Sequence, residues 1–169
     1  MRRRLTADLP EGIVIIADIQ THGKGRQGRS WHSEPGVGLY LSTLLKPDVP
    51  PEKLSCITLM AGVATASALQ QQTSAPVRLK WPNDILINGK KLAGILCECI
   101  PQSGNRSAII VGIGINLNHN HFPENIQNTA TSLKLESGKA VSRTDLALSL
   151  LQNLDAEYEE FLQGKTASL

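Results

Sequence analysis

Short runs of aliphatic and β-branched residues, separated by glycine- and proline-rich breaks, dominate the first two thirds of the chain. Runs of this length and composition are typical of buried β-strands. The dipeptide Asn88-Gly89 is the strongest signal for a tight hairpin turn, and Ser103-Gly104-Asn105 predicts another turn. We therefore predict strands over residues 12–18, 37–45, 77–81, 85–87, 92–98 and 107–116.

Two longer segments predict helices. Residues 52–72 follow a pair of prolines, are rich in Ala, Leu and Met, and contain no proline. Residues 142–162 carry apolar residues at helical spacing, with Ser142 as a predicted N-cap and Asp145 three residues later. Hairpins between two helices predict an α+β fold, a mixed β-sheet flanked by helices, in one domain without internal repeats.

Residues 19–35 change abruptly to Gly, Arg, Lys, Ser and Gln, and we expect a loop there. Its centre reads Gly-Lys-Gly-Arg-Gln-Gly-Arg-Ser-Trp over residues 23–31. Glycines allow the backbone to approach a ligand closely, and arginines can clamp carboxylate or phosphate groups with two donors. A flexible basic surface loop is the alternative. The spacing differs from the P-loop and the dinucleotide fingerprint, because a strand follows instead of a helix.

Two further segments combine turn residues with polar groups. Lys-Trp-Pro-Asn-Asp at residues 80–84 ends a strand, and Lys-Lys-Leu-Ala-Gly-Ile-Leu at residues 90–96 begins the return strand. Gly-Ile-Gly-Ile-Asn-Leu at residues 112–117 places two glycines at alternate strand positions, which indicates close approach of a ligand or another backbone. Taken singly, each segment also fits an ordinary turn, a solvated lysine pair or a bulge.

Composition narrows the function classes. A net charge of +2 is too small to predict a nucleic-acid-binding protein, and no apolar run is long enough for a membrane span. The three cysteines, Cys56, Cys97 and Cys99, do not form a zinc pattern, and we expect them to be reduced in a cytoplasmic protein. His119 and His121 lie in an asparagine-rich turn, where we expect a solvent-exposed loop in preference to a metal site.

The loop and the two later segments, in this order, resemble the signature motifs of biotin protein ligases, from about Gly12 onward. The resemblance implies the catalytic-domain fold that biotin and lipoate protein ligases share. It also implies the reaction: biotin and ATP form biotinyl-5'-AMP, and the biotinyl group then passes to a lysine of a carboxylase carrier domain. The implied partners are biotin, ATP with Mg²⁺, and the biotin carboxyl carrier domain of acetyl-CoA carboxylase.

The resemblance assigns residues to each substrate. The implied biotin-binding residues are Gln20, Gly23, Lys24, Gly25, Arg26, Lys91, Gly94 and Gly112. The implied ATP-binding residues are Arg26, Arg29, Trp31, Asn83, Asp84 and Asn116. Lys91 and Arg26 are the implied catalytic residues, and Asp84 is the candidate ligand for Mg²⁺.

The chain departs from the family pattern in three ways. Lys24 stands where the family commonly has arginine, which keeps the charge but loses the planar fork. The Ser/Thr-Asn segment on the wall of the biotin pocket, and the small C-terminal barrel, are expected to be missing. No helix-turn-helix precedes the domain, so DNA binding is not expected.

Two alternatives to an active biotin ligase stay open. One is a truncated, non-catalytic remnant that binds nucleotide or a partner, and the other is a lipoate or octanoate transferase relative. In the family, edge strands often pair between subunits, and we expect a homodimer in which the strand over residues 107–116 takes part.

Overall fold

The computed structural model describes residues 9–102 and 107–164. Its strands form one six-stranded sheet in the order β1-β2-β6-β5-β4-β3, and all neighbouring strands pair antiparallel. The strands are β1 (Val14–Ala17), β2 (Gly38–Leu45), β3 (Val77–Lys80), β4 (Asp84–Ile87), β5 (Lys90–Pro101) and β6 (Ser107–Asn116). The predicted α+β class is confirmed, and all six predicted strands are present.

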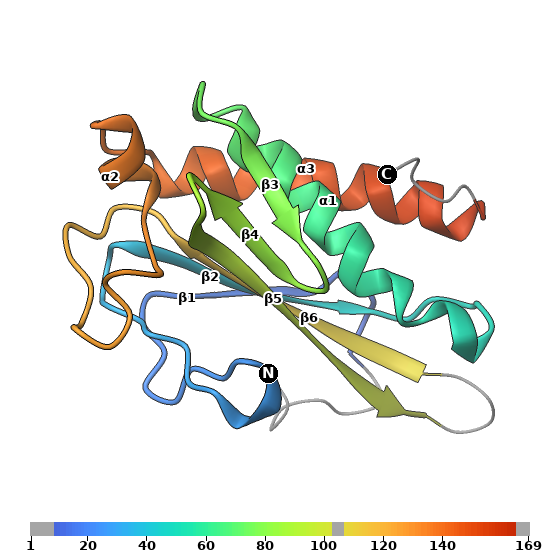
Figure 1. Ribbon diagram of the computed structural model, residues 1–169. Helices are drawn as coiled ribbons and strands as arrows, with labels where there is room; N and C mark the ends of the chain where they lie inside the picture. The colour runs from blue at the N-terminus through green and yellow to red at the C-terminus, as the bar shows by residue number, and fades with distance from the viewer. Residues whose placement is uncertain (1–8, 103–106, 165–169) are drawn as a thin grey trace.

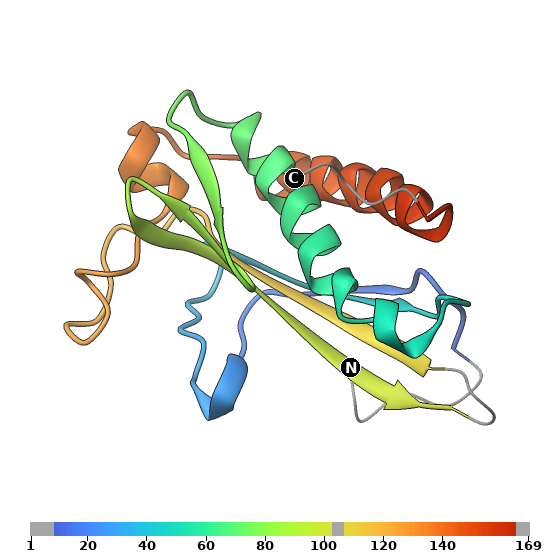
Figure 2. The same cartoon turned by 45° about the vertical axis from the view of Figure 1, so that its right-hand side comes forward.

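Two long helices, α1 (Cys56–Gln70) and α3 (Arg143–Leu162), cover one face of the sheet and pack against each other. Figures 1 and 2 show both helices on the same side of the strands. The main core lies between these helices and side chains of the sheet such as Leu41, Ile95 and Ile113. The opposite face of the sheet stays open for the loop that follows β1, as Figure 2 shows.

Local signals explain most of the helix and turn positions. A 3-10 turn at Pro51–Lys53 precedes α1, so the helix proper begins later than residue 52. The Ser142 hydroxyl caps α3 by accepting a hydrogen bond from the Asp145 backbone N–H at 3.3 Å, as predicted. In the β4–β5 hairpin, Asn88 (φ 48°) and Gly89 (φ 78°) both adopt the positive φ that a two-residue turn requires.

The structure adds one helix to the prediction. The five-residue helix α2 (Leu133–Ser137) begins at Ser132, whose hydroxyl accepts a hydrogen bond from the Leu135 N–H, and ends at Gly138 in the left-handed region. A helix this short has no apolar period to reveal it. The predicted turn at residues 103–105 lies outside the described residues. No helix in the described part of the chain is long and apolar enough to cross a membrane.

The position of β6 corrects one expectation. β6 pairs with β2 on one side and with β5 on the other, so it lies inside the sheet. Its backbone groups are already used in these two ladders, so this strand cannot pair with a second subunit. The edges of the sheet are β1 and β3.

Candidate active site

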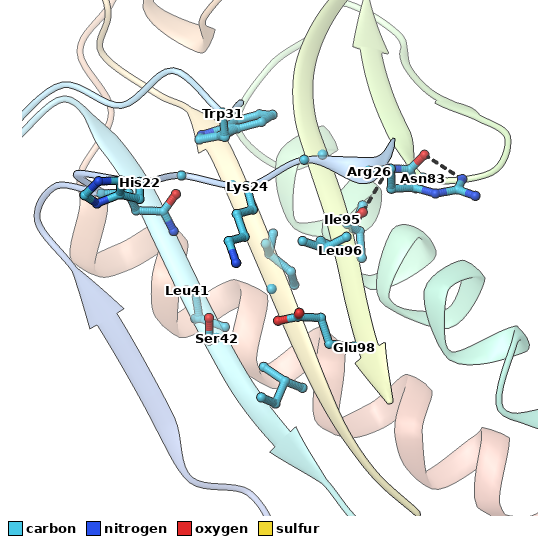
Figure 3. A pocket seen from close by; sticks show the side chains of 18 of the residues that line it. His22, Lys24, Arg26, Trp31, Leu41, Ser42, Asn83, Ile95, Leu96 and Glu98 are labelled. Atoms are coloured by element: carbon cyan, nitrogen blue, oxygen red, sulfur yellow. Dashed lines mark hydrogen bonds between the residues drawn. The ribbon is translucent and has the colours of Figure 1, made fainter. Parts of the chain in front are cut away.

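The glycine-rich loop closes on itself above the open face of the sheet. The Gly25 N–H donates to the Arg29 carbonyl at 2.8 Å, and the Trp31 N–H donates to the Gly23 carbonyl at 2.9 Å. Gly23 is required for this closure, because a Cβ at that position would lie 2.6 Å from the Trp31 carbonyl oxygen. The loop is therefore a defined structure that holds Lys24 and Trp31 above the sheet and Arg26 beside Asn83 (Figure 3).

Trp31 rests on glycines of the two central strands. A Cβ at Gly94 would lie 3.0 Å from Cζ3 of Trp31, and a Cβ at Gly114 would lie 2.6 Å from Cε2. The absence of a side chain at Gly94 thus leaves room for the indole. It also leaves room for the end of the Lys91 side chain, which a Cβ at Gly94 would crowd. The resemblance did not assign Gly114, although the spacing of glycines in this strand was a signal that something approaches closely.

A first pocket of about 820 Å³ lies beside this indole, between the loop and the sheet. All eight residues predicted to bind biotin line it: Gln20, Gly23, Lys24, Gly25, Arg26, Lys91, Gly94 and Gly112. The polar side chains of Ser42 and Glu98 also line it, and sequence reasoning did not single them out. Figure 3 shows these two side chains rising from the strands, with Lys24 and Arg26 coming from the loop.

A second pocket of about 460 Å³ lies on the other side of Trp31. Four of the six residues predicted to contact ATP line it: Arg29, Trp31, Asp84 and Asn116. The other two, Arg26 and Asn83, line the first pocket instead and bond to each other, with Nη1 of Arg26 3.2 Å from Oδ1 of Asn83. The predicted nucleotide set is therefore divided between the two pockets.

Lys91 lies where the two pockets meet. Lys91 and Trp31 are the two residues that line both pockets. The Lys91 ammonium is 2.6 Å from Oδ1 of Asp84 and 5.5 Å from the centre of the Trp31 ring. Its neighbour Lys90 is exposed on the hairpin, as alternation along a strand requires.

The segment after β6 completes the second pocket and was the least predictable part of the site. The Lys91 N–H donates to the Thr129 carbonyl at 2.7 Å, and the Thr131 N–H donates to the Lys91 carbonyl at 3.0 Å. His32 from the loop and Phe122 from this segment lie side by side on the pocket wall, with ring centres 6.3 Å apart. The polar sequence over residues 118–130 has no period that could indicate such a position.

His119 corrects the expectation of a solvent-exposed loop. Its side chain is fully buried and stacks on Phe122, with ring centres 5.1 Å apart. The segment folds inward because the Ser132 hydroxyl donates to the His119 carbonyl at 2.7 Å. In the described structure neither ring nitrogen has a hydrogen-bond partner, and burial lowers the pKa of His119. His121 is exposed, as expected.

Asp84 is the carboxylate that lines the second pocket, and its position decides what it can bind. The described residues contain no group of three or more His, Cys, Asp or Glu side chains suited to a metal ion. Mg²⁺ is commonly held by one or two carboxylates together with substrate phosphates. Asp84 therefore fits Mg²⁺ that arrives with a nucleotide, and in the structure its charge is balanced by Lys91.

The chain matches the model of the biotin/lipoate A/B protein ligase family over residues 2–116. That match covers more than half of the sequence. The chain belongs to this family.

The curated relatives that this chain is similar to are named as ligases. The bifunctional ligase/repressor BirA of Bacillus subtilis is 39% identical over 155 residues, which are 90% of this chain and 48% of that protein. The biotin–[acetyl-CoA-carboxylase] ligase of Mycobacterium tuberculosis is 35% identical over 150 residues, 86% of this chain and 54% of that protein. The chain thus spans about half the length of these family members.

Solved structures confirm the fold of the family. The biotin protein ligase from Aquifex aeolicus in complex with biotin and ATP has a TM-score of 0.78 at 36% identity, covering 92% of this chain and 64% of that one. The ligase from Leishmania major in complex with biotinyl-5-AMP has a TM-score of 0.69 at 26% identity, covering 94% and 73%. The predicted catalytic-domain fold of biotin and lipoate ligases is therefore confirmed.

Proposed function

We propose that this chain is the catalytic domain of an ATP-dependent biotin protein ligase, with biotin in the first pocket and ATP in the second. The observation that carries the proposal is the position of Lys91, on the border of both pockets and 2.6 Å from the carboxylate of Asp84. A carboxylate in one pocket and a phosphate in the other would meet beside this ammonium. The family members crystallised with biotin and ATP, or with biotinyl-5-AMP, support this choice of substrates.

The first step joins two anions. A carboxylate oxygen of biotin attacks the α-phosphorus of ATP, the bond from that phosphorus to pyrophosphate breaks, and pyrophosphate leaves. The protein must align the reactants and offset their charge, because like charges repel on approach. Lys91 offsets charge at the junction, Arg26 and Lys24 on the first-pocket side, and Arg29 on the second-pocket side.

Mg²⁺ would enter with ATP and neutralise its phosphate oxygens. Asp84 is the residue that would hold it, since this carboxylate faces the second pocket. Asp84 would then exchange its ion pair with Lys91 for the metal, which would leave the ammonium free for the biotin carboxylate and the α-phosphate.

In the second step, the neutral amine of an acceptor lysine attacks the biotinyl carbonyl carbon. AMP leaves, and the amine gives up its proton to solvent. We propose that the acceptor belongs to the carrier domain of acetyl-CoA carboxylase, as the name of the M. tuberculosis relative suggests. A cytoplasmic location agrees with the three free cysteines.

The test measures both steps on purified protein. Biotin-dependent pyrophosphate release from ATP, with biotinyl-5'-AMP identified by mass spectrometry, is expected from the first step. Biotinylation of an isolated carrier domain is expected from the second, and a carrier whose acceptor lysine is replaced by arginine is the control. A folded protein that releases no pyrophosphate would favour the remnant. No pyrophosphate release, together with calorimetric binding of lipoate in preference to biotin, would favour the transferase relative.

A further inference from the structure

The Arg26 guanidinium depends on a single side chain for its position. Arg26 lies on the exposed 3-10 turn Arg26–Gly28, next to Gln27 and Gly28 at positive φ. Among the residues that the structure describes, Asn83 is the one group that hydrogen-bonds this guanidinium, through Oδ1 at 3.2 Å. An arginine side chain has several rotatable bonds, so without this acceptor its charge would be spread over a large volume.

Asn83 is itself fixed to the sheet at two further points. Its Nδ2 donates to the Ile95 carbonyl at 2.9 Å, and the Ile95 N–H donates to the Asn83 carbonyl at 2.9 Å. Ile95 belongs to the central strand β5, and Figure 3 shows the link from the strand through Asn83 to Arg26. The strand therefore orients the amide so that its oxygen faces the loop.

An amide is suited to this position for an electrostatic reason. Its oxygen accepts a hydrogen bond from the guanidinium without cancelling the positive charge, whereas a carboxylate would form an ion pair. Asn83 lines the first pocket and is absent from the lining of the second, and both ends of its amide are already bonded within the protein.

We propose that Asn83 is a positioning residue, which fixes the Arg26 guanidinium at the rim of the first pocket so that it holds the phosphate of the adenylate. This inference rests on the proposed function. It differs from the nucleotide contact that the resemblance implied for Asn83, because Asn83 acts here through Arg26 alone.

A double-mutant cycle separates the two roles. We expect Asn83→Ala to speed dissociation of biotinyl-5'-AMP about 3- to 10-fold, the scale of one hydrogen bond to a charged group. In an Arg26→Ala background the same substitution should change the rate by less than about 2-fold, because its partner is gone. Arg29→Ala is the matched control, since Arg29 faces the second pocket, and there the effects should add. An equal Asn83→Ala effect in all three backgrounds would overturn the proposal.

A second readout needs no substrate. Trypsin cleaves after Arg26, and cleavage after Arg29 in the same loop serves as the internal reference. In Asn83→Ala the Arg26 site should be cut at least about 3-fold faster relative to Arg29, because a freer segment reaches the protease more often. If Asn83→Ala does not fold, Asn83→Ser offers a hydroxyl in place of the amide. Unchanged relative cleavage would overturn the proposal. Absence of adenylate from wild type would instead refute the proposed function, whatever trypsin shows.

Discussion

At the scale of single residues, the site is built from glycines as much as from cations. Gly23 allows the loop to close, while Gly94 and Gly114 leave room for the indole of Trp31. Trp31 then separates the two pockets, and Lys91 lies on their border. Because these glycines let Trp31 lie between the two pockets, the cations around it can act on a substrate in each pocket at the same time.

Lys91 is the residue whose loss should be most costly. We expect Lys91→Ala to slow adenylate formation about 100- to 1,000-fold, the scale of one preorganised charge-stabilising donor. Lys90→Ala is the matched control, since this neighbour is exposed on the hairpin, and it should cost far less. Pyrophosphate release with biotin and ATP measures both. Equal losses would show that the assignment of Lys91 is wrong.

Gly114 makes a steric prediction that the sequence motif did not. A methyl group at this position would overlap the indole, whose Cε2 would lie 2.6 Å away. We expect Gly114→Ala to displace Trp31 and weaken biotin binding at least about 10-fold, a cost on the scale of overpacking at a tight contact. Calorimetric titration with biotin measures this. The control is the same substitution in a Trp31→Ala background, where the indole that the methyl group would overlap is gone, and a further loss as large there would contradict the prediction.

At the scale of elements, prediction succeeded where the signal is local. Asn88-Gly89 fixes the β4–β5 hairpin through positive φ, and Ser142 caps α3. Prediction from the sequence failed where tertiary contacts determine the position of a segment. The segment after β6 is drawn inward by bonds between Lys91 and Thr129, which no local pattern reveals. The same holds within the site: the motifs supplied candidate residues, but packing decided that Asn83 bonds Arg26.

The buried His119 makes the segment after β6 sensitive to acid. Burial lowers the pKa of His119, so the unfolded chain takes up this proton more readily than the folded one. The contribution of His119 to stability is complete above its unfolded pKa of about 6.5 and is lost as the pH falls below that value. Urea unfolding at pH 7.5 and 5.5 should show a smaller loss of stability for His119→Phe than for wild type. If His119→Phe and wild type lose the same stability between the two pH values, His119 is not the source of the acid sensitivity.

At the scale of the whole molecule, the sheet has two edge strands, β1 and β3, and the candidate site lies on one of its two faces. The helices α1 and α3 cover one side of the sheet, and the loop after β1 lies on the other side (Figure 2). Residues of this loop line both pockets. Interior β6 is excluded from pairing with a second subunit, whereas β1 forms an edge that carries exposed Ile15 and Ile16, at 40% and 46% exposure. The dimer that the sequence predicts therefore has to form through a surface other than β6.

We expect any self-association to use β1, because exposed apolar side chains on an unpaired edge favour contact with a second copy. Light scattering on increasing concentrations, with and without biotin and ATP, should show a dimer. Ile16→Lys should shift the equilibrium to monomer, since charge on an edge strand opposes pairing. Leu135→Lys is the matched control, an exposed apolar residue on α2, whose Glu136 hydrogen-bonds Asn88 of the β4–β5 hairpin on the other side of the sheet, and it should leave the dimer intact. A strict monomer under all conditions would refute the dimer, and dissociation by Leu135→Lys alone would move the interface to the side of the sheet that carries α2.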